Sequence, residues 1–212
     1  EQTFGPQWRE LFESPDAAQQ QKTAHVPSWW KARRDQLLAM AKEQSPLYVY
    51  DEATLDESIG AMKKLESVDK CFYALKANSP VDVLKKMEAS GIGFECVSEG
   101  EVEHVRNAFP GIDPQRILYT PNFAPKAELV RVMGLGGDRG GVRVTVDSVF
   151  ALEKWADIFR GRDLFLRLDP GAGRGHHDYV KTGGQQSKFG IAAGDLEKLP
   201  ALIEKAGARV VG

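Results

Sequence analysis

The sequence has little cysteine and histidine and no long apolar run. Cys71 and Cys96 are the only two cysteines, and the four histidines are too scattered for zinc-site spacing, so no metal is expected. Both cysteines lie in apolar segments, which favours buried free thiols over a disulfide and hence a reducing, cytoplasmic compartment. No apolar run approaches the roughly 20 residues of a membrane-spanning helix.

The sequence also lacks an excess of either charge. The net charge of −2 gives no electrostatic reason to expect nucleic acid or an anionic membrane as a partner. Residues 1–8 show neither the basic nor the apolar region of a signal peptide, and there is no initiator methionine, which indicates a piece of a longer protein. The hydrophobic content of 42% is enough for a globular core.

Two regions differ in composition. Residues 1–45 begin with a polar, glutamine-rich stretch and continue into a predicted helix at 28–44, with Ser28 as its N-cap. We interpret 1–45 as a linker and docking helix, and 46–212 as the main domain. The pair Trp29-Trp30 either packs this helix onto its own domain or marks a partner surface.

From residue 46 onward, strand-like and helix-like segments alternate. Predicted strands cover 47–50, 71–75, 93–97, 117–119, 142–146, 164–168 and 209–211, and predicted helices cover 51–66, 81–89, 99–109, 125–133, 148–159 and 195–206. Such alternation requires right-handed crossovers and a parallel sheet. Two α/β folds fit it, an open doubly wound sheet and a closed (β/α)₈ TIM-type barrel.

The ends of the predicted strands favour the barrel. An open nucleotide-binding sheet should carry a glycine-rich fingerprint after its first strand, but the segment 76–80 reads Lys-Ala-Asn-Ser-Pro. Polar residues end the strands, as at the mouth of a barrel: Lys76, Ser98, Thr120, Asp147 and Asp169. A barrel needs eight strands and only six follow residue 70, so we expect a barrel truncated after about six strands.

Lys76 is the first candidate for chemistry. It follows the apolar strand 71–75, where partial desolvation favours the uncharged amine that forms an imine with a carbonyl compound. The alternative is a solvated lysine at a strand end. Position alone does not decide between them.

Four motifs in order resemble the barrel-type pyridoxal-phosphate decarboxylases, and diaminopimelate decarboxylases among them. They are Tyr73–Asn78, Gly93–Glu101, Leu166–Gly171 and Thr182–Gly190. The segment Thr120–Pro125 and the histidine pair described below resemble the decarboxylase half of bifunctional enzymes that also carry an aspartate kinase. Residues 1–45 would then be the linker from the kinase half.

The resemblance implies a cofactor and the residues that hold it. Lys76 would bind pyridoxal 5'-phosphate covalently, and Glu95 falls where the family usually has an aspartate near the cofactor ring. Arg167, in the Leu-Arg-Leu-Asp-Pro-Gly segment, would also lie at the cofactor. The alternatives are a Glu95 paired with a neighbouring cation, and an Arg167 that holds another polar group inside the barrel.

Other residues receive roles of their own. His176 and His177 lie in a glycine-rich loop at the barrel mouth, either near the substrate or simply solvated. Lys188 matches a lysine that makes a cross-subunit salt bridge in ornithine decarboxylases, so the resemblance implies a homodimer with shared active sites. His104 is interpreted as a surface residue.

The implied activity is decarboxylation of meso-2,6-diaminopimelate to L-lysine. Alternatives are another basic amino-acid or carboxynorspermidine decarboxylase of this fold, an aldolase that uses Lys76 without pyridoxal phosphate, and a non-catalytic relative. The family draws several cofactor-binding groups from sequence that would lie beyond Gly212, so we expect the chain on its own to be inactive.

Overall fold

The computed structural model describes residues 29–135, 140–171, 183–184 and 188–212. The chain divides into two compact units, Glu1–Leu55 and Asp56–Gly212, which we describe separately. Within the described ranges, none of the helices combines the length and the apolar character needed to cross a membrane.

The described part of the first unit is mostly exposed. The helix predicted at 28–44 is present as α3 (Trp29–Ala32) and α4 (Arg34–Glu43), interrupted at Arg33, and neither helix has a buried residue. The predicted N-cap Ser28 lies outside the described residues. Packing of this helix onto the main domain stays a prediction.

The strand predicted at 47–50 is wrong. These residues form no strand, and Tyr48 is 90% exposed. A strand is stable only when a neighbour satisfies its backbone groups, and no described strand pairs with this segment. The next element, α5 (Glu52–Lys63), begins where the Asp51 carboxylate accepts hydrogen bonds from the Thr54 amide (2.9 Å) and hydroxyl (2.8 Å), which hold the pKa of Asp51 below its usual range.

The second unit contains a six-stranded sheet in which all neighbouring strands are parallel. The strands are β1 (Phe72–Ala74), β2 (Gly93–Cys96), β3 (Ile117–Tyr119), β4 (Arg143–Val146), β5 (Asp163–Leu166) and β6 (Arg209–Val210). Each lies within two residues of its predicted range. The alternation of strands and helices is therefore confirmed from residue 71 onward.

The strand order excludes the doubly wound alternative. A doubly wound sheet reverses its strand order at a switch point, whereas here each strand pairs with the next one along the chain, from β1 to β6. Winding in one direction is the arrangement of a (β/α) barrel. The barrel-type α/β fold predicted from the sequence is thus confirmed, with six consecutive strands described and β1 and β6 at the two edges.

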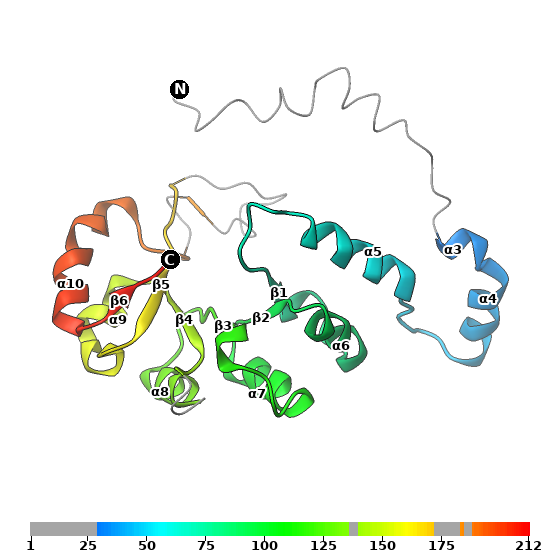
Figure 1. The fold of residues 1–212 in the computed structure, drawn as a ribbon, viewed down its shortest axis with the longest axis horizontal. Coiled ribbons are helices and arrows are strands. Elements are labelled where there is room, and N and C mark those ends of the chain that lie inside the picture. The colour runs from blue at the N-terminus through cyan, green and yellow to red at the C-terminus, as the bar shows by residue number, and fades with distance from the viewer. Residues whose placement is uncertain (1–28, 136–139, 172–182, 185–187) are drawn as a thin grey trace, which may run out of the picture. The chain divides into compact units, whose positions relative to one another are not determined.

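Helices follow one side of the row of strands (Figure 1). They are α6 (Val81–Ala89), α7 (Glu99–Ala108), α8 (Lys126–Gly134), α9 (Val149–Lys154) and α10 (Leu199–Ala206). The predicted helices 148–159 and 195–206 are each divided into an α-helix and a 3₁₀ turn, η4 (Ala156–Phe159) and η6 (Ala193–Lys198). In the second case Pro200 occupies the first turn of α10, where its missing N–H favours a helix start.

In β2 and β3, burial separates the two faces of the sheet. Side chains toward the helices are fully buried, as Phe94 and Cys96 of β2 and Tyr119 of β3 are, and burial raises the pKa of the Cys96 thiol. Residues of the other face, such as Glu95 between them, are half-buried and more polar. Cys96 and the half-buried Cys71 are both free thiols, as predicted.

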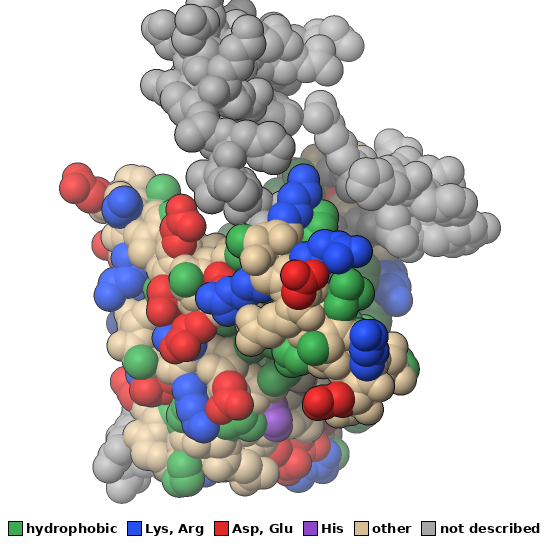
Figure 2. Space-filling view, turned by 90° about the vertical axis from the view of Figure 1, so that its right-hand side faces the viewer, with side chains coloured by type: hydrophobic (Ala, Val, Ile, Leu, Met, Phe, Trp, Pro, Cys, Tyr) green, Lys and Arg blue, Asp and Glu red, His purple; other side chains and the backbone are tan. Residues whose placement is uncertain are grey.

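Charged side chains of both signs occur together on the surface of the described residues (Figure 2). On the face shown in Figure 2, lysine and arginine side chains are intermixed with aspartate and glutamate. Charged side chains also pair between neighbouring elements, as Arg131 of α8 does with Glu99 of α7 at 2.6 and 2.7 Å.

Candidate active site at the carboxyl ends of the strands

Lys76 lies at the carboxyl end of the sheet, on the 3₁₀ turn η1 (Leu75–Ala77) that follows β1. Leu75 is 1% exposed and anchors the turn in the core, while the Lys76 side chain is exposed. The expected partial desolvation of Lys76 is therefore wrong, because the turn directs this side chain away from the packed layer. Its amine is accessible to a carbonyl compound instead.

The residues after Lys76 are fixed by two side chains from other elements. The Tyr73 hydroxyl donates to the carbonyl of Asn78 at 3.0 Å, and Nε2 of His104 lies 2.8 Å from the carbonyl of Ser79. His104 belongs to α7 and is half-buried, so it is more than the surface residue that the sequence suggested. The residues that follow Lys76 are thus held by donors from β1 and α7.

Glu95 lies on β2, the strand next to β1, and β1 leads into the turn of Lys76. It pairs in register with Ala74 of β1, two residues before Lys76, and with Leu118 of β3. Its carboxylate accepts a hydrogen bond from the Thr120 hydroxyl at the end of β3. The partner described for Glu95 is therefore a hydroxyl group rather than the cation that one alternative required.

Arg167 follows β5 and is held by an aromatic ring and an amide. Its guanidinium lies 4.6 Å from the ring centroid of Phe189, and Nη1 donates to Oδ1 of Asn122 at 3.4 Å. A half-buried guanidinium needs such neighbours to replace lost water. Both roles considered for Arg167, at the cofactor and toward another polar group inside the barrel, stay predictions.

Asp147 is a site residue that the sequence marked only as a strand end. The Arg167 amide donates to the Val146 carbonyl at 2.9 Å, which continues the β4–β5 pairing and puts Asp147 beside Arg167. Burial raises the pKa of Asp147, while the positive charge of Arg167 lowers it. Its Oδ2 atom is buried and has no hydrogen-bond partner among the described residues. An unsatisfied buried acceptor has no sequence signature and emerges only from the fold.

The loop after β5 returns to the same strand end. Oδ1 of Asp169 accepts hydrogen bonds from the amides of Gly171 (3.0 Å) and Gly184 (2.8 Å). Ile191 then forms a parallel bridge with Leu168. This return brings the segment 188–191 to the mouth, including the Phe189 ring that contacts Arg167.

The other predicted residues of this loop are only partly described. Lys188 is exposed, with its Nζ 5.2 Å from the Phe189 ring centroid. His176 and His177 lie outside the described residues. Their predicted roles stay predictions.

Gly190 is required where this segment meets β5. Its φ is +84°, and a Cβ atom would lie 2.9 Å from the Asp169 amide nitrogen and 3.0 Å from the Leu168 carbonyl carbon. We expect Gly190→Ala to lower the free energy of unfolding by about 1–3 kcal/mol, because it adds a left-handed backbone penalty to a backbone clash. Urea unfolding measures the change. Gly161→Ala is the control: its φ is +69° with nothing within 4 Å, so equal losses in both variants would contradict a role for the contact with β5.

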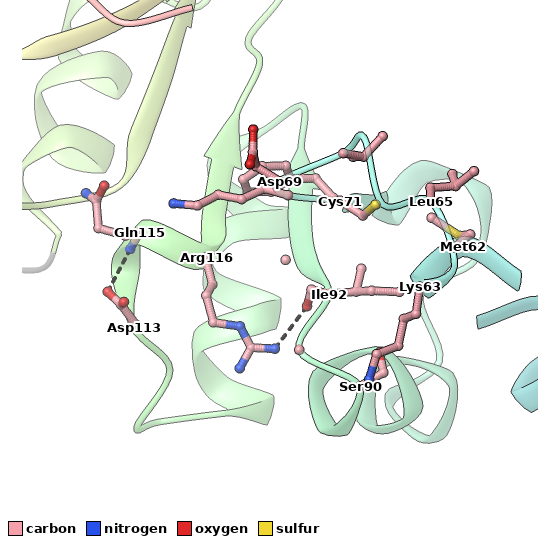
Figure 3. Close-up of a pocket in the computed structure, with 15 residues that line it drawn as sticks. Met62, Lys63, Leu65, Asp69, Cys71, Ser90, Ile92, Asp113, Gln115 and Arg116 are labelled. Carbon is pink, nitrogen blue, oxygen red and sulfur yellow. Dashed lines mark hydrogen bonds between the residues drawn. The ribbon is translucent and has the colours of Figure 1, made fainter. Parts of the chain in front are cut away.

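A separate cavity of about 430 Å³ lies at the opposite end of the sheet (Figure 3). Arg116 points into this region and donates to the carbonyl of Ile92 at 2.9 Å and to the carboxylate of Glu88 at 2.8 Å. The residues that line the cavity precede the strands rather than follow them. In barrels that end of the sheet serves stability, so this cavity is not the candidate active site.

The mouth thus combines groups suited to a carbonyl compound that also carries charge. It offers the accessible amine of Lys76, the carboxylate of Glu95 and the guanidinium of Arg167 at the carboxyl end of one sheet. An amine in such a place can bond a carbonyl carbon, and the other two groups can fix polar atoms around it. No cluster of three or more His, Cys, Asp or Glu side chains that could hold a metal occurs among the residues described.

The chain is similar in sequence to known decarboxylases. Residues 52–212 match the family described as pyridoxal-dependent decarboxylase, pyridoxal binding domain. The chain is 32% identical over 176 residues to a diaminopimelate decarboxylase of Streptomyces coelicolor, covering 82% of this chain and 38% of that protein. It is 34% identical over 173 residues to the diaminopimelate decarboxylase of Methanothermobacter thermautotrophicus, covering 79% and 39%.

Solved structures give the same result. A crystal structure of diaminopimelate decarboxylase superposes with a TM-score of 0.70 at 31% identity and covers 84% of this chain and 41% of that one. The Helicobacter pylori enzyme complexed with L-lysine has the same fold, with a TM-score of 0.67 at 22% identity over 84% and 44% of the two chains. The chain therefore spans about two-fifths of the length of the proteins it resembles.

Proposed function

The chain belongs to the family of pyridoxal-dependent decarboxylases, and from this membership we propose that it is the pyridoxal-binding part of an enzyme that converts meso-2,6-diaminopimelate to L-lysine and CO₂. The observation that carries the proposal is the exposed Lys76 at the mouth of the sheet. This sheet lies within residues 52–212, the range that matches the family. Residues 46–212 would form the pyridoxal-binding barrel domain, and 1–45 its linker and docking helix.

The residues of the mouth fit pyridoxal phosphate. Lys76 would supply the primary amine for its aldehyde carbon, and Glu95 and Arg167 would supply opposite charges for its polar atoms. When bound, the cofactor accepts the electrons released as the bond between Cα and the carboxylate breaks. Thr120 and Asn122 orient Glu95 and Arg167 through their hydrogen bonds.

The substrate assignment has one competitor. The diaminopimelate decarboxylases of Streptomyces coelicolor and Escherichia coli are each 32% identical to this chain. A probable ornithine decarboxylase of Dictyostelium discoideum is 30% identical over 151 residues, which keeps ornithine as the second candidate. The greater coverage by the diaminopimelate enzymes favours the first.

The partners belong to the proposal as well. We propose a cytoplasmic homodimer with Lys188 at its interface and with His176 and His177 near the substrate, supported by the family motifs in which these residues occur. The exposure of Lys188 is compatible with an interface. Fusion to an aspartate kinase is supported by the resemblance of the Thr120–Pro125 segment to bifunctional enzymes.

A substrate panel tests the activity. We expect the full-length protein with pyridoxal phosphate to release CO₂ from meso-2,6-diaminopimelate with a kcat/KM at least about tenfold higher than from ornithine or arginine, a margin of about 1.4 kcal/mol in transition-state binding. A preference for ornithine would assign the second candidate. No CO₂ from any of the three would refute the decarboxylase proposal.

The aldolase alternative is separated by the covalent state of Lys76. We expect the purified full-length protein to absorb visible light, and borohydride to bleach that absorbance while fixing the cofactor to Lys76. A colourless protein that borohydride labels only when a carbonyl substrate is added would favour the aldolase.

A further inference from the structure

We propose that His104 is a positioning residue for Lys76, acting through the carbonyl of Ser79. This inference rests on the proposed covalent role of Lys76. The sequence alone does not predict the contact of His104 with Ser79, because the two residues lie 25 positions apart on different elements.

The contact joins the loop after Lys76 to α7, the second helix that follows this loop in the chain. His104 lies on α7, the helix that follows β2, and its Nε2 is 2.8 Å from the Ser79 carbonyl in the loop between η1 and α6. Val102 and Val105 on the same helix are fully buried, so the backbone that presents His104 is fixed in the core. The imidazole therefore ties the loop to a rigid support.

The partner of His104 determines which ring nitrogen carries a proton. A carbonyl oxygen only accepts hydrogen bonds, so Nε2 must carry the proton and donate. The neutral tautomer protonated at Nε2 and the doubly protonated ring both donate from this atom. The hydrogen bond to the Ser79 carbonyl therefore does not require a charged ring.

A second hydrogen bond acts on the neighbouring residue. The Tyr73 hydroxyl donates to the Asn78 carbonyl at 3.0 Å, so consecutive carbonyls are held by donors from β1 and α7. Lys76 lies only two residues before this pair of anchors, on a turn of three residues. Without the His104 anchor, the loop gains conformations in which the Lys76 amine is misaligned for the cofactor aldehyde.

Three variants of the full-length protein test the proposal. His104→Leu removes the donor, and His104→Gln keeps an N–H donor on a side chain of similar reach. Arg106→Leu is the matched control, because Arg106 is an exposed residue of the same helix and has no role in the proposal. For each protein, absorbance titration gives the dissociation constant of pyridoxal phosphate, and amide hydrogen exchange reports on peptides that cover residues 72–80.

We expect His104→Leu to weaken cofactor binding about three- to tenfold, as one lost neutral hydrogen bond would, and to speed amide exchange in this segment. His104→Gln should recover most of both, and Arg106→Leu should match the wild type. Wild-type affinity and exchange in a folded His104→Leu would overturn the proposal, as would equal losses in all three variants.

The two proposals fail in different ways. A wild-type protein that binds no pyridoxal phosphate would refute the proposed function. Hydrogen exchange of residues 72–80 would then still decide whether His104 holds the loop, since that readout needs no cofactor.

Discussion

Replacing Lys76 by alanine is expected to abolish covalent attachment of pyridoxal phosphate and to lower kcat/KM by about four orders of magnitude or more, the scale on which enzymes lose activity when a covalent catalytic group is removed. The structure supports an effect on chemistry rather than on folding. The Lys76 side chain is exposed, whereas the neighbouring Leu75 carries the packing of the turn. Thermal unfolding of the cofactor-free variant should therefore match the wild type.

Two further substitutions make this result specific. Lys76→Arg keeps the positive charge but lacks a primary amine, so it should be as inactive as alanine if the bond to the aldehyde matters. Lys70→Ala removes an exposed lysine that precedes β1, at the opposite end of that strand, and should leave activity unchanged. A Lys76→Ala variant that retains more than about a tenth of the wild-type kcat/KM would contradict the proposed role.

Much of the fold could be predicted because each element carries its own signal. The strand at 93–97 is short and apolar, and the helix at 99–109 begins at Ser98, whose hydroxyl accepts a hydrogen bond from the Glu101 amide at 3.3 Å. Alternation of such elements restricts the connections, so the parallel sheet follows. The strand order came from the structure, and it decided between the two α/β folds.

The wrong predictions share a cause. The segment 47–50 has a strand-like composition, but none of the described strands pairs with it. Lys76 follows an apolar strand, yet the 3₁₀ turn rotates its side chain into solvent rather than into the packed layer. In both cases the local sequence is typical of the predicted feature, but the tertiary surroundings decide the structure that forms.

The candidate site also combines residues that the sequence identifies with contacts that only the structure shows. Lys76, Glu95 and Arg167 were identifiable because each lies in or directly after a predicted strand and in a family motif. The contacts of His104 with Ser79 and of Arg167 with Phe189 join separate elements, and the orphaned oxygen of Asp147 depends on burial. Sequence patterns report position along one element, and such contacts depend on how several elements meet.

Arg167 supports the second large prediction, which separates a role at the cofactor from a role inside the barrel. We expect Arg167→Met in the full-length protein to lower kcat/KM by about 10²–10³-fold, the usual cost of removing one preorganised charged donor from an active site. The kcat/KM of Arg167→Lys should fall between those of Arg167→Met and the wild type. Lysine keeps the charge but loses the planar fork that stacks on Phe189 and reaches Asn122. Steady-state CO₂ release measures both.

The matched controls are the two neighbours of the guanidinium. Phe189→Leu keeps an apolar side chain beside Arg167 but removes the ring, and Asn122→Ala removes the hydrogen-bond acceptor. Each should cost no more than about tenfold in kcat/KM, because one neighbour still orients the charge. Losses in these variants as large as in Arg167→Met would show that orientation, and not the charge alone, sets the rate.

The stability of Arg167→Met should depend on pH through Asp147. Burial raises the pKa of Asp147 in the folded chain and Arg167 opposes this, so the substitution raises that pKa further. A carboxyl group with a raised folded pKa costs stability once the pH rises above its unfolded pKa of about 4, where the unfolded chain ionises first. The destabilisation of Arg167→Met relative to the wild type should therefore be larger at pH 7 than near pH 4 in urea unfolding. The same destabilisation at both pH values would show that Arg167 does not stabilise the Asp147 carboxylate, and an unchanged kcat/KM would remove Arg167 from the cofactor site.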